Sequence, residues 1–371
     1  MLKILFTLLK WVLLCFIVLA AAAAAFVYFS PVFGGKPDAA SLARIQASPQ
    51  FKNGVFTNIE PTQIGTGEEE RPSLLTWLSS VLNPPPGKHP AEPLPTHAFD
   101  NAAVVDNSFT WFGHSTVLFQ TAGTKLLTDP VFYRASPIFI GGKPFAMTHT
   151  PQTSELPFVD AVLLSHDHYD HLDERAIKEI NTKVGHFYVP LGVKGHLQRW
   201  GVAGDKITEL DWHESAKLGD VELTLTPARH FSGRNFNSRN PSLWGSWVVK
   251  SPQLSVYYNG DSGYGVHFAD IGQQYGPFDM ALIENGAYNQ AWAQIHMMPE
   301  ESVQAALDVR AQTVMPVHWG KFDLAYHPWK EPVERFLAAA AGQPFRTATP
   351  RIGQTFMLDN PPQEKWWENV R

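Results

Sequence analysis

The sequence predicts an α/β fold: one large domain that follows an apolar N-terminal helix. The 371 residues are 44% hydrophobic and 17% charged, which is enough apolar material for a sizeable core. From about residue 101, short β-type runs alternate with helical stretches, as in a domain of mixed strands and helices. The single cysteine, Cys15, excludes an intrachain disulfide framework and a cysteine-rich zinc site.

The charge balance argues against nucleic acid as a partner. The chain has 29 Lys and Arg against 35 Asp and Glu, a net charge of −6. This balance gives no general attraction to a polyanion. The domain also has no run of Lys and Arg that would follow a phosphate backbone, which disfavours a nuclease.

Residues 1–30 are predicted to form a transmembrane signal-anchor. Residues 11–29 carry no charge, and as a helix they would span about 28 Å, close to the hydrocarbon thickness of a bilayer. Lys3 and Lys10 precede this run, so the charge bias places the domain on the extracytoplasmic side of the membrane. A signal peptide cleaved within the alanines at 20–25 is the alternative, but Phe26 and Tyr28 continue the apolar run beyond them.

Residues 31–100 are predicted to be a proline-rich tether, with three consecutive prolines at 84–86. One part has the period of a short amphipathic helix. Its apolar stripe is expected to pack on the domain; a helix lying on the lipid surface is the alternative, although such helices usually carry more Lys and Arg. The stripe comprises Leu74, Leu75, Trp77, Leu78, Val81 and Leu82.

Residues 101–360 are predicted to form the α/β domain, with a C-terminal tail at 361–371. Residues 109–120 and 125–128 are typical of paired strands that turn at 122–123. Residues 161–164 predict a buried strand that leads into a histidine-rich loop. Helices are predicted over residues 173–181, 193–200, 299–310 and 331–341.

The histidine-rich loop, residues 165–171, is the strongest functional signal in the chain. In an extended loop, residues two apart point the same way, so His166 and His168 can face one metal ion. Asp170 and His171 can face a neighbouring ion after the chain turns. So many titratable groups at a strand end would be costly without a cation to compensate them.

Further ligands are expected from three other loops. His230 follows the alternating run at 221–226, Asp261 follows residues 256–258, and His318 follows residues 314–317. Each therefore lies at the C-terminal end of an apolar stretch. Nitrogen and oxygen ligands without a thiolate suit two zinc ions, and other divalent first-row metals remain an alternative.

The sequence resembles the metallo-β-lactamase superfamily through the motif H-x-H-x-D-H at 166–171. It resembles more closely the branch that contains N-acylphosphatidylethanolamine-hydrolysing phospholipase D. The segments that carry this likeness are residues 111–116, 127–130, 243–247, 260–264, 276–279 and 318–320.

The resemblance implies an αβ/βα four-layer sandwich with a dimetal site at one edge of its two sheets. It assigns His166, His168 and His230 to one zinc ion and Asp170, His171 and His318 to the other. Asp261 would bridge the two ions.

The resemblance also implies hydrolysis of a phosphodiester in an N-acylated phospholipid, with phosphatidic acid and an N-acylethanolamine as products. The expected partners are a phospholipid or amphipathic small molecule and the membrane. His296 occupies the position of a further active-site histidine of the branch. The sequence leaves the oligomeric state open.

Several other residues have two interpretations. Tyr169, Trp244 and Trp247 are candidates for substrate contact, with packing as the alternative. His114 and Asp129, in segments shared with the branch, are expected to orient ligands. The remaining histidines, including His196, are expected to have no role at the site.

Two other functions stay open. The same metal pair could hydrolyse a carbonyl substrate such as a lactone or a β-lactam, because ligand spacing does not separate these reactions. A non-catalytic, membrane-anchored zinc scaffold is the second alternative. Structural zinc sites are usually closed sets of four ligands, which disfavours the scaffold.

Overall fold

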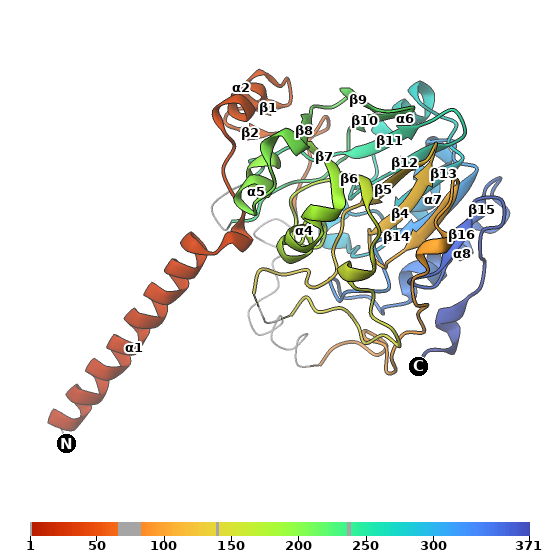
Figure 1. Cartoon of the computed structure of the whole chain (residues 1–371). Coiled ribbons are helices and arrows are strands. Elements are labelled where there is room, and N and C mark those ends of the chain that lie inside the picture. The colour runs from red at the N-terminus through yellow and green to blue at the C-terminus, as the bar shows by residue number, and fades with distance from the viewer. Residues whose placement is uncertain (1, 66–82, 139–140, 236–238) are drawn as a thin grey trace.

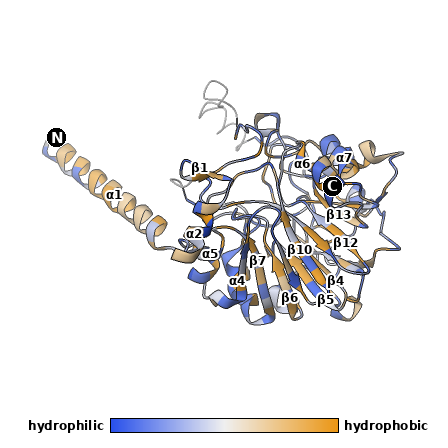
Figure 2. Cartoon of the chain, turned by 90° about the horizontal axis from the view of Figure 1, so that it is seen from above, coloured by the Kyte–Doolittle hydropathy of each residue, from blue (hydrophilic) through white to orange (hydrophobic). Residues whose placement is uncertain are grey.

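The computed structural model describes residues 2–65, 83–138, 141–235 and 239–371. Helix α1 (Leu2–Phe29) projects away from the rest of the molecule (Figure 1). It is long and apolar enough to cross a membrane, with a mean hydropathy of 2.7, and none of the stretch is buried. Apolar residues dominate α1 (Figure 2). The amphipathic helix predicted at 74–82 lies outside the described residues.

The chain after α1 folds onto the domain, whereas the sequence predicted an extended tether. It forms η1 (Pro31–Phe33), α2 (Ala39–Ala47), β1 (Phe51–Lys52) and β2 (Val55–Phe56). The Asp38 side chain caps α2 by accepting a hydrogen bond from Ser41 N. Phe33, Ile45, Phe56 and Leu94 are buried. These widely spaced apolar residues hold the segment in place, and no local periodicity reveals them.

Two seven-stranded sheets form the centre of the domain. The order of the first sheet is β16-β3-β4-β5-β6-β7-β8, antiparallel as far as β5 and parallel from β5 to β8. Its strands are β3 (Ser108–Trp111), β4 (Val117–Thr121), β5 (Thr124–Thr128), β6 (Val159–Leu163), β7 (Val184–Pro190), β8 (Ile207–Leu210) and β16 (Thr355–Met357).

The order of the second sheet is β15-β14-β13-β12-β11-β10-β9, antiparallel from β9 to β12 and parallel from β12 to β15. Its strands are β9 (Ser215–Leu218), β10 (Val221–Thr226), β11 (Ser246–Lys250), β12 (Ser255–Tyr258), β13 (Met280–Glu284), β14 (Thr313–Val317) and β15 (Arg346–Thr347).

Three hydrophobic clusters separate four layers, which confirms the αβ/βα sandwich. Along β11, Trp247 and Val249 join the cluster between the two sheets, while Val248 joins the cluster on the outer face. Strand residues alternate in this way because successive side chains point to opposite faces. Helices α4 (Glu174–Ile180) and α5 (Lys194–Arg199) pack on the first sheet. Helices α6 (His267–Gln274), α7 (Pro299–Asp308) and α8 (Glu331–Ala340) pack on the second.

The predicted helices lie within two residues of α4, α5, α7 and α8. The strand predicted at 109–120 is instead two strands, β3 and β4, paired antiparallel with each other. The chain turns between them where Gly113 has φ of 85° and His114 has φ of 54°. This turn brings His114 to the edge of the sheets.

The C-terminal residues, predicted as a tail at 361–371, pack on the domain. They form η8 (Trp366–Asn369), in which Trp366 and Trp367 are fully buried. The Trp366 ring lies 5.5 Å from that of Trp319 in the central cluster. Burial of two large aromatic side chains makes the end of the chain part of the domain.

Candidate metal centre

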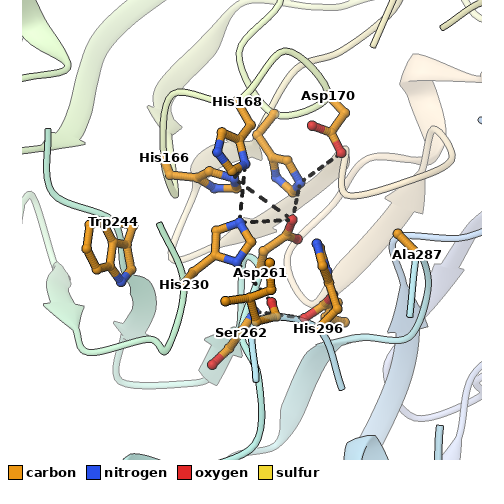
Figure 3. Close-up of polar contacts among 12 residues, drawn as sticks. His166, His168, Asp170, His230, Trp244, Asp261, Ser262, Ala287 and His296 are labelled. Carbon is orange, nitrogen blue, oxygen red and sulfur yellow. Dashed lines mark hydrogen bonds and ion pairs between the residues drawn. The ribbon is translucent and has the colours of Figure 1, made fainter. Parts of the chain in front are cut away.

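The seven predicted ligands converge at one edge of the two sheets. Five of them, His166, His168, Asp170, His230 and Asp261, are labelled in Figure 3. The loop that carries His166, His168, Asp170 and His171 begins directly after β6. Each of the other three ligands follows a strand: His230 comes after β10, Asp261 after β12 and His318 after β14. Because the carboxyl ends of these strands meet at one edge, residues far apart in sequence share one site.

The side chains form two groups. His166, His168, His230 and Asp261 place one ligand atom each within 4.8 Å of one another. Asp170, His171 and His318 form the second group, together with His114, within the same limit.

The Asp261 carboxylate lies between the two groups. Its Oδ2 atom is 3.1 Å from both His171 Nε2 and His318 Nε2. The same oxygen is 3.9 Å from His166 Nε2 and 3.8 Å from His230 Nε2. The Asp261 carboxylate is therefore shared by the two groups.

The polar atoms of the cluster fit a cation. His171 Nε2, both ring nitrogens of His318 and Asp261 Oδ1 are buried and make no hydrogen bond. Leaving such atoms without a partner is costly. Imidazole and carboxylate donors are those that zinc and similar divalent metals prefer. The residues present therefore fit a metal centre.

The ionisation of the first group also suits metal binding. Burial, reinforced by neighbouring imidazoles, holds the pKa of His166 and His230 well below the ordinary value, so both rings are neutral. Burial likewise lowers the pKa of His168. Burial opposes the charge on Asp261, but His171 and His318 outweigh it and hold the pKa of that carboxyl well below its usual range. Neutral imidazole and carboxylate are the forms that coordinate metal.

The backbone is strained at three residues of the site. His114, Asp129 and His318 have φ of 54°, 30° and 67°, in the left-handed region that non-glycine residues rarely adopt. Such conformations cluster where the surrounding structure holds a functional side chain in place.

The structure places both predicted orienting residues behind the ligands. Asp129 Oδ2 accepts a hydrogen bond from His171 Nδ1 at 2.6 Å, and Tyr258 Oη also donates to this oxygen. Asp129 Oδ1 accepts from Ser165 N at 2.8 Å. His114 Nε2 lies 3.1 Å from Asp170 Oδ2. Partners of this kind fix the orientation of metal ligands.

Three supporting residues carried no functional assignment from the sequence. Asn58 makes two hydrogen bonds with the backbone of His230. Its Nδ2 donates to the carbonyl at 2.8 Å, and its Oδ1 accepts from the N–H at 3.0 Å. Asp167, inside the motif, accepts hydrogen bonds from Gly233 N and Ser242 Oγ. Glu284 ends β13 at the same edge as the ligands, and this position after an apolar strand is the signal that could have revealed it.

His296 lies beside the ligand cluster. Its ring centroid is 5.1 Å from that of His230 and 5.5 Å from that of His318. Its Nδ1 atom contacts the fully buried Glu284 carboxylate, which also accepts from Ser262 N at 2.7 Å. Burial raises the pKa of Glu284 above its ordinary value. The contact with Glu284 therefore fixes the orientation of the His296 ring beside the cluster.

Tyr169, Trp244 and Trp247, the candidates for substrate contact, are not among the described residues that line the cavity at the ligand cluster. Trp244 and Trp247 are fully buried, and their indole N–H groups donate to backbone carbonyls at 3.0 and 2.9 Å. Tyr169 stacks on Arg234 at 4.2 Å and donates to its carbonyl. The two tryptophans therefore pack inside the domain, whereas Tyr169 is only partly buried and lines a separate open cavity.

An open cavity of about 360 Å³ leads to the ligand cluster. Metal-site side chains form its polar floor, and its walls are mostly apolar. Such a cavity suits a substrate with one polar and one apolar part. Its lining is Ile64, Gly65, His168, Asp170, Phe231, Asp261, Ala287, Trp292, Ile295, His296, His318 and Leu324.

Comparisons with known proteins agree with this fold and site. Residues 124–319, more than half of the chain, match the family described as a beta-lactamase superfamily domain. An uncharacterised protein of Mycobacterium tuberculosis is 44% identical over 340 residues, which cover 89% of this chain and 90% of that protein.

An N-acyl-phosphatidylethanolamine-hydrolyzing phospholipase D of Caenorhabditis elegans is 37% identical over 229 residues, which cover 58% of this chain and 64% of that enzyme. Among solved structures, the metallo hydrolase Igni18 of Ignicoccus hospitalis superposes with a TM-score of 0.53 at 21% identity. That match covers 67% of this chain and 97% of Igni18, and at this identity it bears on the fold alone. The chain belongs to the metallo-β-lactamase superfamily and is a metal-dependent hydrolase of that fold.

Proposed function

We propose that the protein is a dizinc phosphodiesterase of the phospholipase D type. Its substrate would be an N-acylphosphatidylethanolamine-like lipid, and its products phosphatidic acid and an N-acylethanolamine. The single observation that carries this proposal is the position of the His and Asp cluster at the floor of an apolar-walled cavity. The phospholipase of C. elegans, which is 37% identical to this chain over 229 residues, supports the substrate class.

The ligand set assigns a place to each ion. His166, His168 and His230 would hold one zinc ion, Asp170, His171 and His318 the other, and Asp261 both. When bound, a pair of divalent ions supplies a nucleophile derived from water near neutral pH and stabilises negative charge on a phosphoryl oxygen.

His296 would act on the leaving group. Glu284 engages its Nδ1 atom, so Nε2 is the nitrogen that can face a substrate in the cavity. A proton held at Nε2 would pass to the alcohol oxygen as the phosphorus–oxygen bond breaks, which is general acid catalysis.

The walls of the cavity would receive the lipid. Ile64, Phe231, Trp292, Ile295 and Leu324 supply apolar surface around the polar floor. Contact with acyl chains removes this surface from water, which is favourable. A cavity that offers both kinds of surface supports this substrate class.

The N-terminal helix is proposed to anchor the protein in the membrane, with the domain on the extracytoplasmic side. Helix α1 has the length and hydropathy of a membrane span, and its charged residues, Lys3 and Lys10, lie in its first half. An anchored domain meets its lipid substrate without leaving the bilayer surface.

The test compares two substrates on the full-length, metal-loaded protein in detergent. We expect release of an N-acylethanolamine from N-acylphosphatidylethanolamine, and no release by Asp261→Asn, which replaces the anionic bridge with a neutral side chain of similar size. An acyl lactone serves as the second substrate. Turnover of the lactone alone would replace the phosphodiesterase proposal with a lactonase, and inactivity toward both would favour the zinc scaffold.

A further inference from the structure

Arg234 is a buried cation that lies outside the ligand set. Its side chain is only 3% exposed, and it forms no ion pair within the described parts of the chain. The guanidinium lies 4.2 Å from the ring centre of Tyr169 and 5.1 Å from that of Trp200. A buried charge without a paired carboxylate is costly unless hydrogen bonds compensate it.

The hydrogen bonds of Arg234 join two segments that are far apart in sequence. Nε and Nη2 donate to the carbonyl of Val32 at 3.1 and 2.9 Å. Nη1 donates to the carbonyls of Asp167 and Leu172 at 2.7 and 2.9 Å. Val32 lies three residues beyond the end of α1, and Asp167 and Leu172 enclose most of the metal-binding loop. One rigid, planar group therefore fixes the distance between these segments.

A second contact links the same segments. Gly35 N donates to His196 Nδ1 at 3.0 Å, and His196 Nε2 lies 3.3 Å from Asp167 Oδ2. A Cβ atom on Gly35 would lie 2.1 Å from the Gly195 carbonyl, so the backbone after α1 packs directly on α5. Figure 1 shows α1 meeting the domain beside α5. His196, which the sequence left without a role, belongs to this connection.

We propose that Arg234 is a positioning residue that fixes the metal-binding loop to the backbone leaving α1. Asp167 lies between His166 and His168, so holding its carbonyl sets where these two ligands stand. The placement of the loop thus depends on the segment that connects it to the N-terminal helix. This inference rests on the proposed ligand set, but not on the identity of the substrate.

The test measures metal binding by the full-length protein in detergent, with zinc competed by a chromophoric chelator. Arg234→Met removes all donors, and we expect zinc affinity to fall about 10- to 100-fold, as for other residues that orient ligands. Arg234→Lys keeps the positive charge but not the planar guanidinium group, so we expect a smaller loss of zinc affinity. Arg199→Ala is the matched control, because Arg199 donates to the carbonyls of Phe29 and Ser30 at the same junction without reaching the loop.

A second measurement separates positioning from a general loss of stability. Cobalt(II) in place of zinc gives a visible spectrum that reports ligand geometry. We expect a changed spectrum for Arg234→Lys and an unchanged one for Arg199→Ala. Wild-type zinc affinity and cobalt spectrum in folded Arg234→Met would overturn the proposal, as would an equal loss in Arg199→Ala. If Arg234→Met does not fold, zinc affinity and the cobalt spectrum of Arg234→Lys test the proposal instead, and wild-type values for both would overturn it. Because no substrate is used, failure here differs from failure of the phosphodiesterase proposal.

Discussion

Asp129 accepts a hydrogen bond from His171 Nδ1 at 2.6 Å, and both side chains are fully buried. This contact leaves His171 Nε2 directed at the ligand cluster, 3.1 Å from Asp261 Oδ2. A residue that follows β5 thus sets the orientation of a ligand that follows β6.

Removing this contact should weaken metal binding. We expect Asp129→Ala to lower zinc affinity about 10- to 100-fold, because His171 loses the acceptor that fixes its ring. Chelator competition measures the effect. Asp106→Ala is the control, since Asp106 accepts hydrogen bonds from the Gln120 side chain and Gly123 N and belongs to none of the ligand groups among the described residues. Equal affinities for wild type and Asp129→Ala would refute the orienting role.

His296 should act in catalysis and not in metal retention. We expect His296→Ala to lower kcat about 100-fold or more, the usual contribution of a general acid, with metal content unchanged. Glu284→Gln should lower kcat by less, because the ring loses the carboxylate that contacts its Nδ1 atom. Steady-state kinetics together with elemental analysis tests both variants. The control is His213→Ala, which changes an exposed histidine that belongs to none of the ligand groups among the described residues. Loss of metal from His296→Ala would make this residue a ligand instead.

Metal affinity should rise with pH. Burial opposes the charge on His171 and His318, but Asp261 and other carboxylates outweigh it, raising the pKa of His318 to about 10 and that of His171 well above its ordinary value. Both rings are therefore protonated near pH 7 in the metal-free chain. Metal binding must displace these protons, so affinity increases as pH rises toward the raised pKa values. Calorimetry in buffers of different ionisation enthalpy measures the released protons, and a pH-independent affinity would contradict this account.

The C-terminal residues should contribute to stability. Trp367 is fully buried in the central cluster, and we expect Trp367→Ala to lower the free energy of unfolding by about 3–5 kcal/mol through lost burial and a cavity. Lys365→Ala, on an exposed side chain two residues earlier, is the matched control. Denaturant unfolding compares the two. Similar stabilities would show that the end of the chain is a dispensable tail.

The sequence predicted which side chains converge at the site, because each has a local signal. His230, Asp261 and His318 each end an apolar run, and the ends of parallel strands meet at one edge of a sheet. The helices were located for the same reason, since caps and periodicity are local: Asp173 caps α4, and Pro299 begins α7.

The parts that the sequence did not predict depend on long-range packing. Whether Trp244 faces a cavity or the core depends on which element covers it, and its own neighbours in sequence do not record this. Residues 31–62 pack on the domain through isolated contacts, such as the two hydrogen bonds between the Asn58 side chain and the His230 backbone. Arg234 likewise acquires its role only when Val32 and the metal-binding loop lie on either side of it.

Metal stoichiometry tests the central claim most directly. Elemental analysis of the purified full-length protein, together with anomalous diffraction at the zinc edge, counts and locates the ions. The account predicts two zinc ions per chain, both in contact with Asp261, with no more than one retained by Asp261→Asn. A metal-replete protein that holds no ion among His166, His168, His230, Asp170, His171 and His318 would contradict it.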